Sequence, residues 1–207
     1  AGLSLTLGFV SAIALVWLTG QALPIIVPGM GLTLTPTGMV RVLVAALVIG
    51  VVAALTPAEH EVSICDENVE PLDLDADADL IGVSFMTALA DRAYEIADAF
   101  RARGKMVVAG GYHPTLCPED ATAHFDAIVI GDAEGVWPRL LSDAAHGRLQ
   151  KTYRSDRLCD LSAAPVPRRD LTARNAKHYV TTNAVQTGRG CRHGCRYCSV
   201  TAFHRRN

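Results

Sequence analysis

The sequence has no charged residue before Arg41, although charged residues make up 19% of the chain. Residues 3–18 are almost wholly apolar, and a membrane-spanning helix needs roughly 20 such residues. A cleaved signal peptide is disfavoured because no positively charged region precedes the apolar run. Two interpretations stay open for the N-terminal segment, residues 1–40: it contains a membrane helix, or it is a buried or misassigned extension.

Lys and Arg are absent between Pro57 and Leu80, where nine acidic residues occur. Residues 168–207 show the opposite balance, with nine Lys or Arg residues and one acid, Asp170. A basic tail can bind nucleic acid. Aromatic side chains that would stack on bases are scarce, however, at 6% of the chain, and they do not alternate with these charges. We therefore expect no nucleic-acid partner and interpret the positive charge as compensation for thiolates and an anionic ligand.

Cysteines are few. Six in 207 residues are too few for a disulfide scaffold of this size. Three of them, Cys191, Cys195 and Cys198, lie within eight residues, and such clustering indicates a metal site in a reducing compartment. We therefore expect a cytoplasmic protein, attached to a membrane only if residues 3–18 form a membrane helix.

From Arg41 onward, short apolar runs alternate with amphipathic stretches, which predicts strands and helices in turn. Residues 89–103, for example, place Ala93, Ala97 and Phe100 on one helical face. This alternation predicts an α/β fold with a doubly wound, parallel, five-stranded sheet of the Rossmann type. The predicted strands are residues 42–48, 61–65, 80–85, 106–109 and 127–130, and the predicted helices are residues 89–103, 118–124 and 136–146, preceded by one that ends before Thr56.

The pattern also suggests domain boundaries. Residues 41–147 form the predicted α/β domain. Residues 148–179 have mixed charge and no clear period, which is typical of a linker. Residues 180–207 are expected to begin a further domain, with a first strand at residues 180–187.

Ligands of parallel sheets bind at the carboxyl ends of the strands. In the loops expected there, Gly110 and Gly111 allow a bulky ligand to approach the backbone. Ser84 and Thr87 offer hydroxyls, and Glu134 opens a helix, where a carboxylate is also favourable beside the helix dipole. A turn or capping role stays open for each of these three. The candidates for ligand contact are Ser84, Thr87, Gly110, Gly111, Gly131 and Glu134, and we assign no catalytic side chain.

The strongest pattern is the loop Cys191-Arg-His-Gly-Cys195-Arg-Tyr-Cys198. Three thiolates in one loop can face a single centre only if the backbone wraps around it, and Gly190 and Gly194 permit this. Cysteine thiolates are the usual ligands of iron–sulfur clusters. The alternative is a structural zinc site that adds His204 as fourth ligand, although this spacing and the preceding predicted strand are not typical of zinc knuckles.

The cysteine spacing, with Tyr197 before the last cysteine, resembles the signature of the radical S-adenosylmethionine (SAM) superfamily. The resemblance implies that Cys191, Cys195 and Cys198 bind a [4Fe–4S] cluster. It also implies that the open iron chelates SAM, and that an external electron donor starts the cleavage that releases a 5'-deoxyadenosyl radical. Tyr197 joins the candidate cofactor-contacting residues on this basis.

The turn Gly110-Gly-Tyr-His-Pro-Thr115, with Asp66-Glu-Asn68 and Gly131-Asp-Ala-Glu-Gly135, resembles the cobalamin-binding domain of cobalamin-dependent radical SAM proteins. This implies cobalamin as a further cofactor. Two departures stand out: no Asp-x-His-x-x-Gly motif supplies a cobalt-ligating histidine, and the predicted first strand lacks a Pro- or Gly-rich turn after it. His113 is a candidate for cofactor contact, and a local hydrogen-bonding role is favoured over metal ligation.

The resemblance implies a radical SAM enzyme, here a fragment without most of its barrel, that carries out methylation or another radical modification of a small-molecule substrate. We expect the fragment alone to be inactive. Two alternatives stay open: the α/β domain is a docking module without cobalamin, or the chain is a non-catalytic zinc-binding module.

Overall fold

The computed structural model describes residues 25–26, 33–34, 50–155, 159–179 and 185–204. The chain divides into two units, Ala1–Val44 and Ala45–Asn207. In the first unit, β1 (Ile25–Ile26) pairs antiparallel with β2 (Thr33–Leu34). The apolar run at residues 3–18 and the predicted strand at residues 42–48 lie outside the described residues. None of the helices in the described part of the chain has the length and apolar character that crossing a membrane requires.

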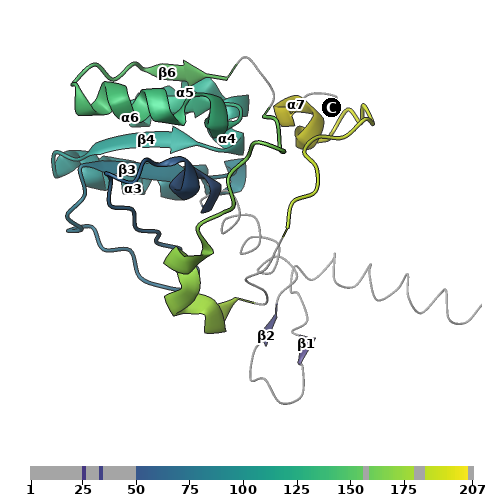
Figure 1. Ribbon diagram of the computed structural model, residues 1–207, viewed down its shortest axis with the longest axis horizontal. Coiled ribbons are helices and arrows are strands. Elements are labelled where there is room, and N and C mark those ends of the chain that lie inside the picture. The colour runs from purple at the N-terminus through teal and green to yellow at the C-terminus, as the bar shows by residue number, and fades with distance from the viewer. Residues whose placement is uncertain (1–24, 27–32, 35–49, 156–158, 180–184, 205–207) are drawn as a thin grey trace, which may run out of the picture. The chain divides into compact units, whose positions relative to one another are not determined.

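The second unit is built on a parallel sheet in the order β3-β4-β5-β6 (Figure 1). Its strands are β3 (Leu80–Ser84), β4 (Met106–Gly110), β5 (Ala127–Ile130) and β6 (Thr152–Arg154). Ser84 pairs with Gly110, and Ile130 pairs with Arg154. Because all four strands run in parallel, their carboxyl ends lie along one edge of the sheet.

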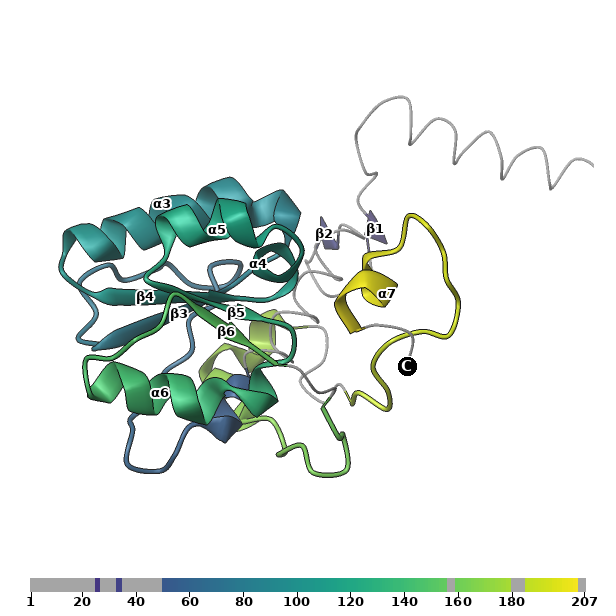
Figure 2. The same ribbon diagram turned by 90° about the horizontal axis from the view of Figure 1, so that it is seen from above.

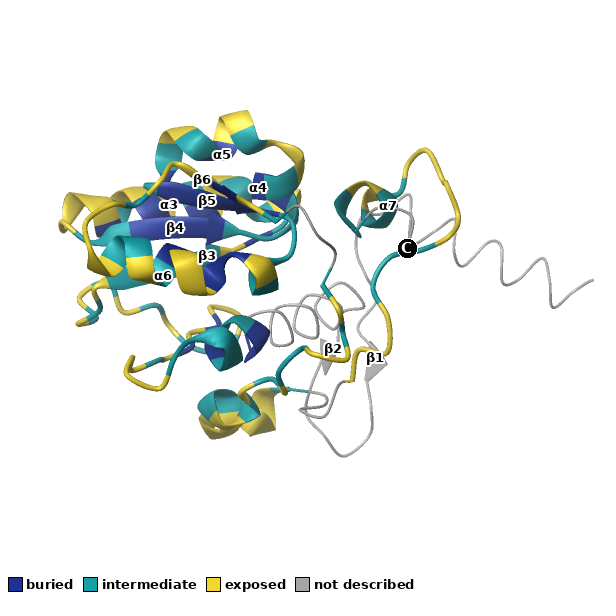
Figure 3. Cartoon of the chain, turned by 45° about the horizontal axis from the view of Figure 1, so that its top comes forward, coloured by how far each residue is buried: buried dark blue, intermediate teal, exposed yellow. Residues whose placement is uncertain are grey.

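Helices cover both faces of this sheet (Figure 2), as the doubly wound prediction requires. On one face, α3 (Ala90–Ala102) and α5 (Pro118–His124) pack against Val107 and Ile128. On the other, α6 (Trp137–Ala145) packs against Val108 and Val129. Neighbouring residues of one strand thus serve opposite cores, as the two-residue period of a strand dictates. Figure 3 shows the burial concentrated in β4 and β5.

Within the described residues the parallel sheet has four strands, and two of the predicted strand assignments change. Residues 61–65 are not a strand, although Ile64 is buried between exposed Ser63 and Cys65. The alternation of burial that predicted a strand is therefore present, but no ladder of hydrogen bonds pairs this segment with the sheet. The strand that was missed, β6, lies in the expected linker. It has three residues, of which Tyr153 alone is buried. So short a segment shows no alternation of apolar and polar residues from which a strand could be predicted.

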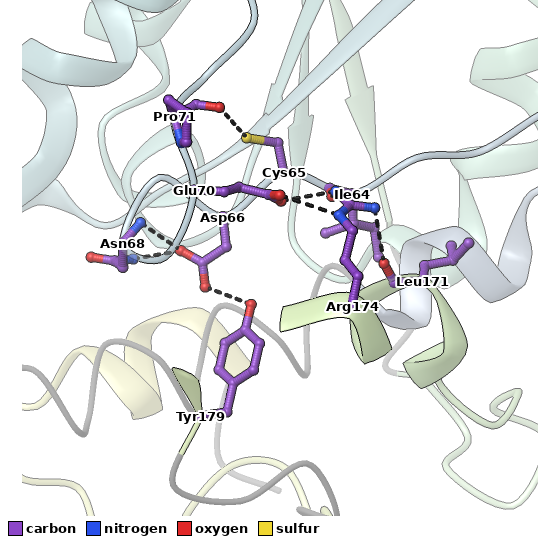
Figure 4. A network of polar contacts seen from close by, with 9 residues as sticks. All are labelled: Ile64, Cys65, Asp66, Asn68, Glu70, Pro71, Leu171, Arg174 and Tyr179. Atoms are coloured by element: carbon purple, nitrogen blue, oxygen red, sulfur yellow. Dashed lines mark hydrogen bonds and ion pairs between the residues drawn. The ribbon is translucent and has the colours of Figure 1, made fainter. Parts of the chain in front are cut away.

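The segment after β6 also contains the 3-10 helix η3 (Arg169–His178), which is fastened to the acidic loop before β3 (Figure 4). The Arg174 guanidinium donates to the Glu70 carboxylate at 2.9 Å and to the Ile64 carbonyl at 2.7 Å. Tyr179 donates its hydroxyl proton to Asp66 Oδ2 at 3.2 Å. Because Asp66 is buried, this contact satisfies a polar group that would otherwise be costly.

Candidate functional site

The carboxyl edge of β3, β4 and β5 is where the structure places most of the predicted ligand residues. Ser84 ends β3, Gly110 ends β4, and Gly131 directly follows β5. Thr87 begins the short 3-10 helix η1 (Thr87–Leu89), and both hydroxyl-bearing residues are exposed. The edge therefore presents the exposed hydroxyl-bearing residues Ser84 and Thr87 beside the partly buried glycines Gly110 and Gly131.

Contacts within the protein require a glycine at position 111. Its φ is +96°, and a Cβ there would lie 2.9 Å from the carbonyl oxygen of Phe85 and 3.0 Å from Ser84 Oγ. If this glycine only left room for a ligand, a side chain here would push into that ligand. It would instead collide with the end of β3, so replacing Gly111 tests the fold before it tests ligand binding.

His113 lies in α4 (Tyr112–Leu116) and is 3% exposed. Its Nε2 is 2.8 Å from the Tyr94 hydroxyl and 3.2 Å from Asp120 Oδ2, and its Nδ1 is 3.2 Å from Thr87 Oγ1. Both ring nitrogens are thus engaged within the protein. This geometry agrees with the local hydrogen-bonding role that the sequence favoured over metal ligation.

A cluster of charged side chains stands at the end of β5. It joins Glu134, a candidate for ligand contact, and His204 of the zinc alternative to two residues that the sequence did not single out. Arg189 Nη1 lies 3.2 Å from Asp132 Oδ1, and Arg189 Nη2 lies 2.6 Å from Glu134 Oε1. His204 Nδ1 is 3.5 Å from the same oxygen of Asp132. The Arg189, Asp132 and Glu134 side chains are only 13%, 9% and 12% exposed, so these ion pairs are screened little by solvent. We call these four residues the Arg189 cluster.

The pKa of Asp132 shows which influence dominates in the Arg189 cluster. Burial alone would raise this pKa, but the contact with His204 and the charge of Arg189 outweigh burial and lower it. Asp132 is therefore held as a carboxylate. The signal for this contact was in the sequence, as acids in Gly131–Gly135 and the basic C-terminal region, but nothing in composition pairs residues so far apart.

An aromatic contact accompanies the Arg189 cluster. Tyr112 of α4 stacks on Phe203 of α7 (Ser199–His204), with ring centroids 4.5 Å apart. Burial raises the pKa of Tyr112, and the nearby Cys198 adds to that shift. The two contacts bring the cysteine loop to the carboxyl edge of the sheet.

The three cysteines of the loop are free thiols. Cys191 and Cys198 are partly buried and Cys195 is exposed, while Tyr197 is 93% exposed. No three His, Cys, Asp or Glu side chains converge as metal ligands within the described residues. The donor set nevertheless suits a cluster, because three thiols of one loop are unpaired and accessible. His204, the fourth ligand of the zinc alternative, contacts Asp132 instead.

In the comparison with protein families, residues 39–141 match the B12 binding domain. This range contains β3, β4, β5 and the loops that carry Ser84, Gly111 and Gly131. It stops before the cysteine loop.

Curated relatives extend the comparison beyond that range. The bacteriochlorophyllide d C-8(2)-methyltransferase of Chlorobaculum tepidum is 36% identical over 162 residues, which are 76% of this chain and 36% of that protein. The bacteriochlorophyllide d C-12(1)-methyltransferase of the same organism is 28% identical over 74% of this chain and 34% of its own length. An uncharacterized methyltransferase of Synechocystis, sll1242, is 27% identical over 80% of this chain and 31% of its own length. The chain thus spans about a third of the length of these relatives.

Proposed function

Residues 39–141 match the B12 binding domain family, and on that premise we propose that this chain is the cofactor-binding part of a cobalamin-dependent radical SAM methyltransferase. The relatives at up to 36% identity are methyltransferases by name, which supports methyl transfer as the reaction. The cysteine spacing supports the radical SAM assignment. The methyl acceptor is a small molecule, and an external electron donor is required.

The carboxyl edge of the sheet is the proposed corrin site. Ser84 and Thr87 supply exposed hydroxyls there, and Gly110 and Gly131 bring backbone close to the ligand. Both nitrogens of His113 are engaged with protein partners, so cobalt would receive no imidazole from that residue. In the proposed protein, bound cobalamin supplies a metal that accepts and passes on a methyl group, and a cluster on the cysteine loop supplies the electron that cleaves SAM.

The Arg189 cluster is the observation that carries this proposal. Arg189 lies two residues before Cys191, and its guanidinium is held by Asp132 and Glu134 beyond the carboxyl end of β5. The start of the cysteine loop is therefore fixed beside the proposed corrin site. Two cofactors that act on one substrate must be close to each other, because a group held in place reacts far faster than one that diffuses.

The proposal is tested on full-length protein reconstituted anaerobically with iron and sulfide. Cys191→Ala, Cys195→Ala and Cys198→Ala should each lose most cluster absorbance and all cleavage of SAM, because all three thiolates are needed to hold the cluster. Cys65→Ala, at an exposed cysteine outside the loop, is the matched control and should keep both. SAM cleavage that survives in any one loop variant would contradict the assignment, and one bound zinc in place of iron and sulfide would favour a structural metal module.

A further inference from the structure

A chain of hydrogen bonds, here called the relay, runs from the surface to the carboxyl edge of the sheet. Its four side chains are those of Asp120, Tyr94, His113 and Thr87. Asp120 Oδ2 accepts the Tyr94 hydroxyl proton at 3.0 Å and lies 3.2 Å from His113 Nε2. The Tyr94 oxygen is 2.8 Å from the same nitrogen. At the other side of the ring, His113 Nδ1 is 3.2 Å from Thr87 Oγ1. The relay therefore ends on an exposed hydroxyl three residues after the end of β3.

When the His113 ring is neutral, proton counting gives each bond in the relay a direction. A tyrosine hydroxyl has one proton, and the carboxylate of Asp120 is the strongest acceptor within its reach. His113 Nε2 faces that carboxylate and the Tyr94 oxygen, so this nitrogen must carry the ring proton. In the neutral ring Nδ1 is then an acceptor, and the proton of Thr87 points to it.

The surroundings hold this arrangement in place. The His113 ring lies 5.5 Å from the Phe85 ring, centroid to centroid, and the side chain is almost fully buried. Burial is the largest cause that raises the pKa of Tyr94 to about 12, and the hydrogen bond to Asp120 is the next largest. The tyrosine therefore keeps its proton. The ring of His124 stacks on the ring of Tyr94, with centroids 4.0 Å apart. Rotation of either ring would break a packed contact as well as a hydrogen bond.

The consequence lies at Thr87. Its only proton is committed to His113, so the hydroxyl presents lone pairs alone to anything that approaches the edge. Such a group accepts hydrogen bonds from N–H donors and offers none to carbonyl groups. The rim of a corrin carries primary amides, whose NH₂ groups are donors of this kind.

We propose that Thr87 is a specificity-determining acceptor for an amide N–H of the bound corrin, and that Asp120, Tyr94 and His113 are positioning residues that hold its hydroxyl in that state. This inference rests on the proposed function, because it names the ligand of the same site. It adds a role for His113 that is neither metal ligation nor a turn contact alone.

The relay itself is tested without any cofactor. Long-range ¹⁵N–¹H correlation spectra of full-length protein should show a protonated Nε2 and an unprotonated Nδ1 in His113. Thr87→Val should leave this tautomer unchanged, because Asp120 and Tyr94 select it, but should shift the Nδ1 resonance as its donor is lost. A protonated Nδ1 in the wild-type protein would overturn the inference, whether or not a corrin binds.

The ligand is tested by equilibrium dialysis with hydroxocobalamin. Thr87→Val keeps the size and shape of the side chain and should weaken binding by about tenfold, the loss of one hydrogen bond. Thr87→Ser keeps the hydroxyl and is the matched control, with binding within about twofold of wild type. Equal affinities for the valine and serine variants would reduce Thr87 to a structural role and overturn the ligand assignment. No binding by the wild type would overturn the proposed function with it, while the tautomer would still be read from the spectra.

Discussion

At Gly111 the peptide of Phe85 occupies the space in which a side chain would begin. The φ of +96° and the 2.9 Å approach to the Phe85 oxygen both act against any Cβ. Gly104 offers a comparison at the same scale, because its φ is +76° but nothing lies within 4 Å of its would-be Cβ. The two glycines thus separate the cost of backbone strain from the cost of collision.

We predict that Gly111→Ala lowers the free energy of unfolding by about 3 kcal/mol, the sum of strain and overlap. Gly104→Ala should cost about 1 kcal/mol, since strain alone applies there. Urea denaturation of both variants measures the difference. Equal losses of unfolding free energy at the two positions would show that the end of β3 shifts to make room for a side chain. Substitution of Gly111 would then report directly on ligand binding.

Tyr153 is the residue that makes β6 a strand of this sheet. Its side chain is fully buried, its hydroxyl donates to Asp143 Oδ2 at 2.9 Å, and its oxygen accepts the Gln150 N–H at 3.0 Å. The tyrosine joins the C-terminal end of α6 to the strand that follows. A strand of three residues depends on such contacts because its own ladder is short.

We predict that Tyr153→Phe destabilises the protein by about 1–2 kcal/mol, because a carboxylate and an amide lose their shared partner. Tyr197→Phe removes the same hydroxyl from a side chain that is 93% exposed and should leave stability unchanged. The comparison is made by thermal or urea unfolding. A neutral Tyr153→Phe change would mean that packing of the ring, and not the hydrogen bonds, holds β6.

The attachment of η3 depends on an ionised Glu70. The hydrogen bond from Arg174 lowers the pKa of Glu70 below its ordinary value of 4.5, against the opposing effect of burial. Because the pKa of Glu70 is lower in the folded than in the unfolded protein, its carboxylate contributes fully to the free energy of unfolding above the ordinary pKa. That contribution is lost as the pH falls through the pKa of the folded protein. The contribution is modest, under about 1 kcal/mol, because Arg174 is half exposed.

We therefore predict that wild type exceeds Glu70→Gln in stability by a constant amount above the ordinary pKa of a glutamate, 4.5, and that the difference shrinks as the pH falls below it. Glu61→Gln removes an exposed carboxylate of the same loop and is the control for the loss of one surface charge. Urea unfolding across this pH range measures both differences. A gap between wild type and Glu70→Gln that stays constant down to low pH would contradict the role of the ion pair.

Local pattern was enough for the elements that have a long amphipathic or apolar run. The prediction of residues 118–124 as a helix is confirmed by α5, and residues 89–103 differ from α3 only at the ends. Residues 61–65 failed because alternating burial does not show whether a strand has a partner. The Arg189 cluster could not be predicted at all, because its two halves are joined by folding and not by spacing.

At the scale of the whole molecule, residues 39–141 match the B12 binding domain. Ion pairs of Arg189 hold the start of the cysteine loop beside the carboxyl edge of the sheet in that range. Residues 41–147, 148–179 and 180–207 stay predictions as domain boundaries, although β6 and η3 give the expected linker more structure than its sequence indicated. Membrane association through residues 3–18 and the absence of a nucleic-acid partner also stay predictions.

The central claim is that the carboxyl edge of the sheet holds cobalamin, and cobalt content measures it most directly. Full-length protein should be incubated with excess hydroxocobalamin under anaerobic conditions, freed of unbound corrin and assayed for cobalt and for corrin absorbance. The account predicts about one corrin for each protein molecule, since one sheet edge offers one site. Protein that retains iron and sulfide but no cobalt would contradict it, and would make this domain a docking module.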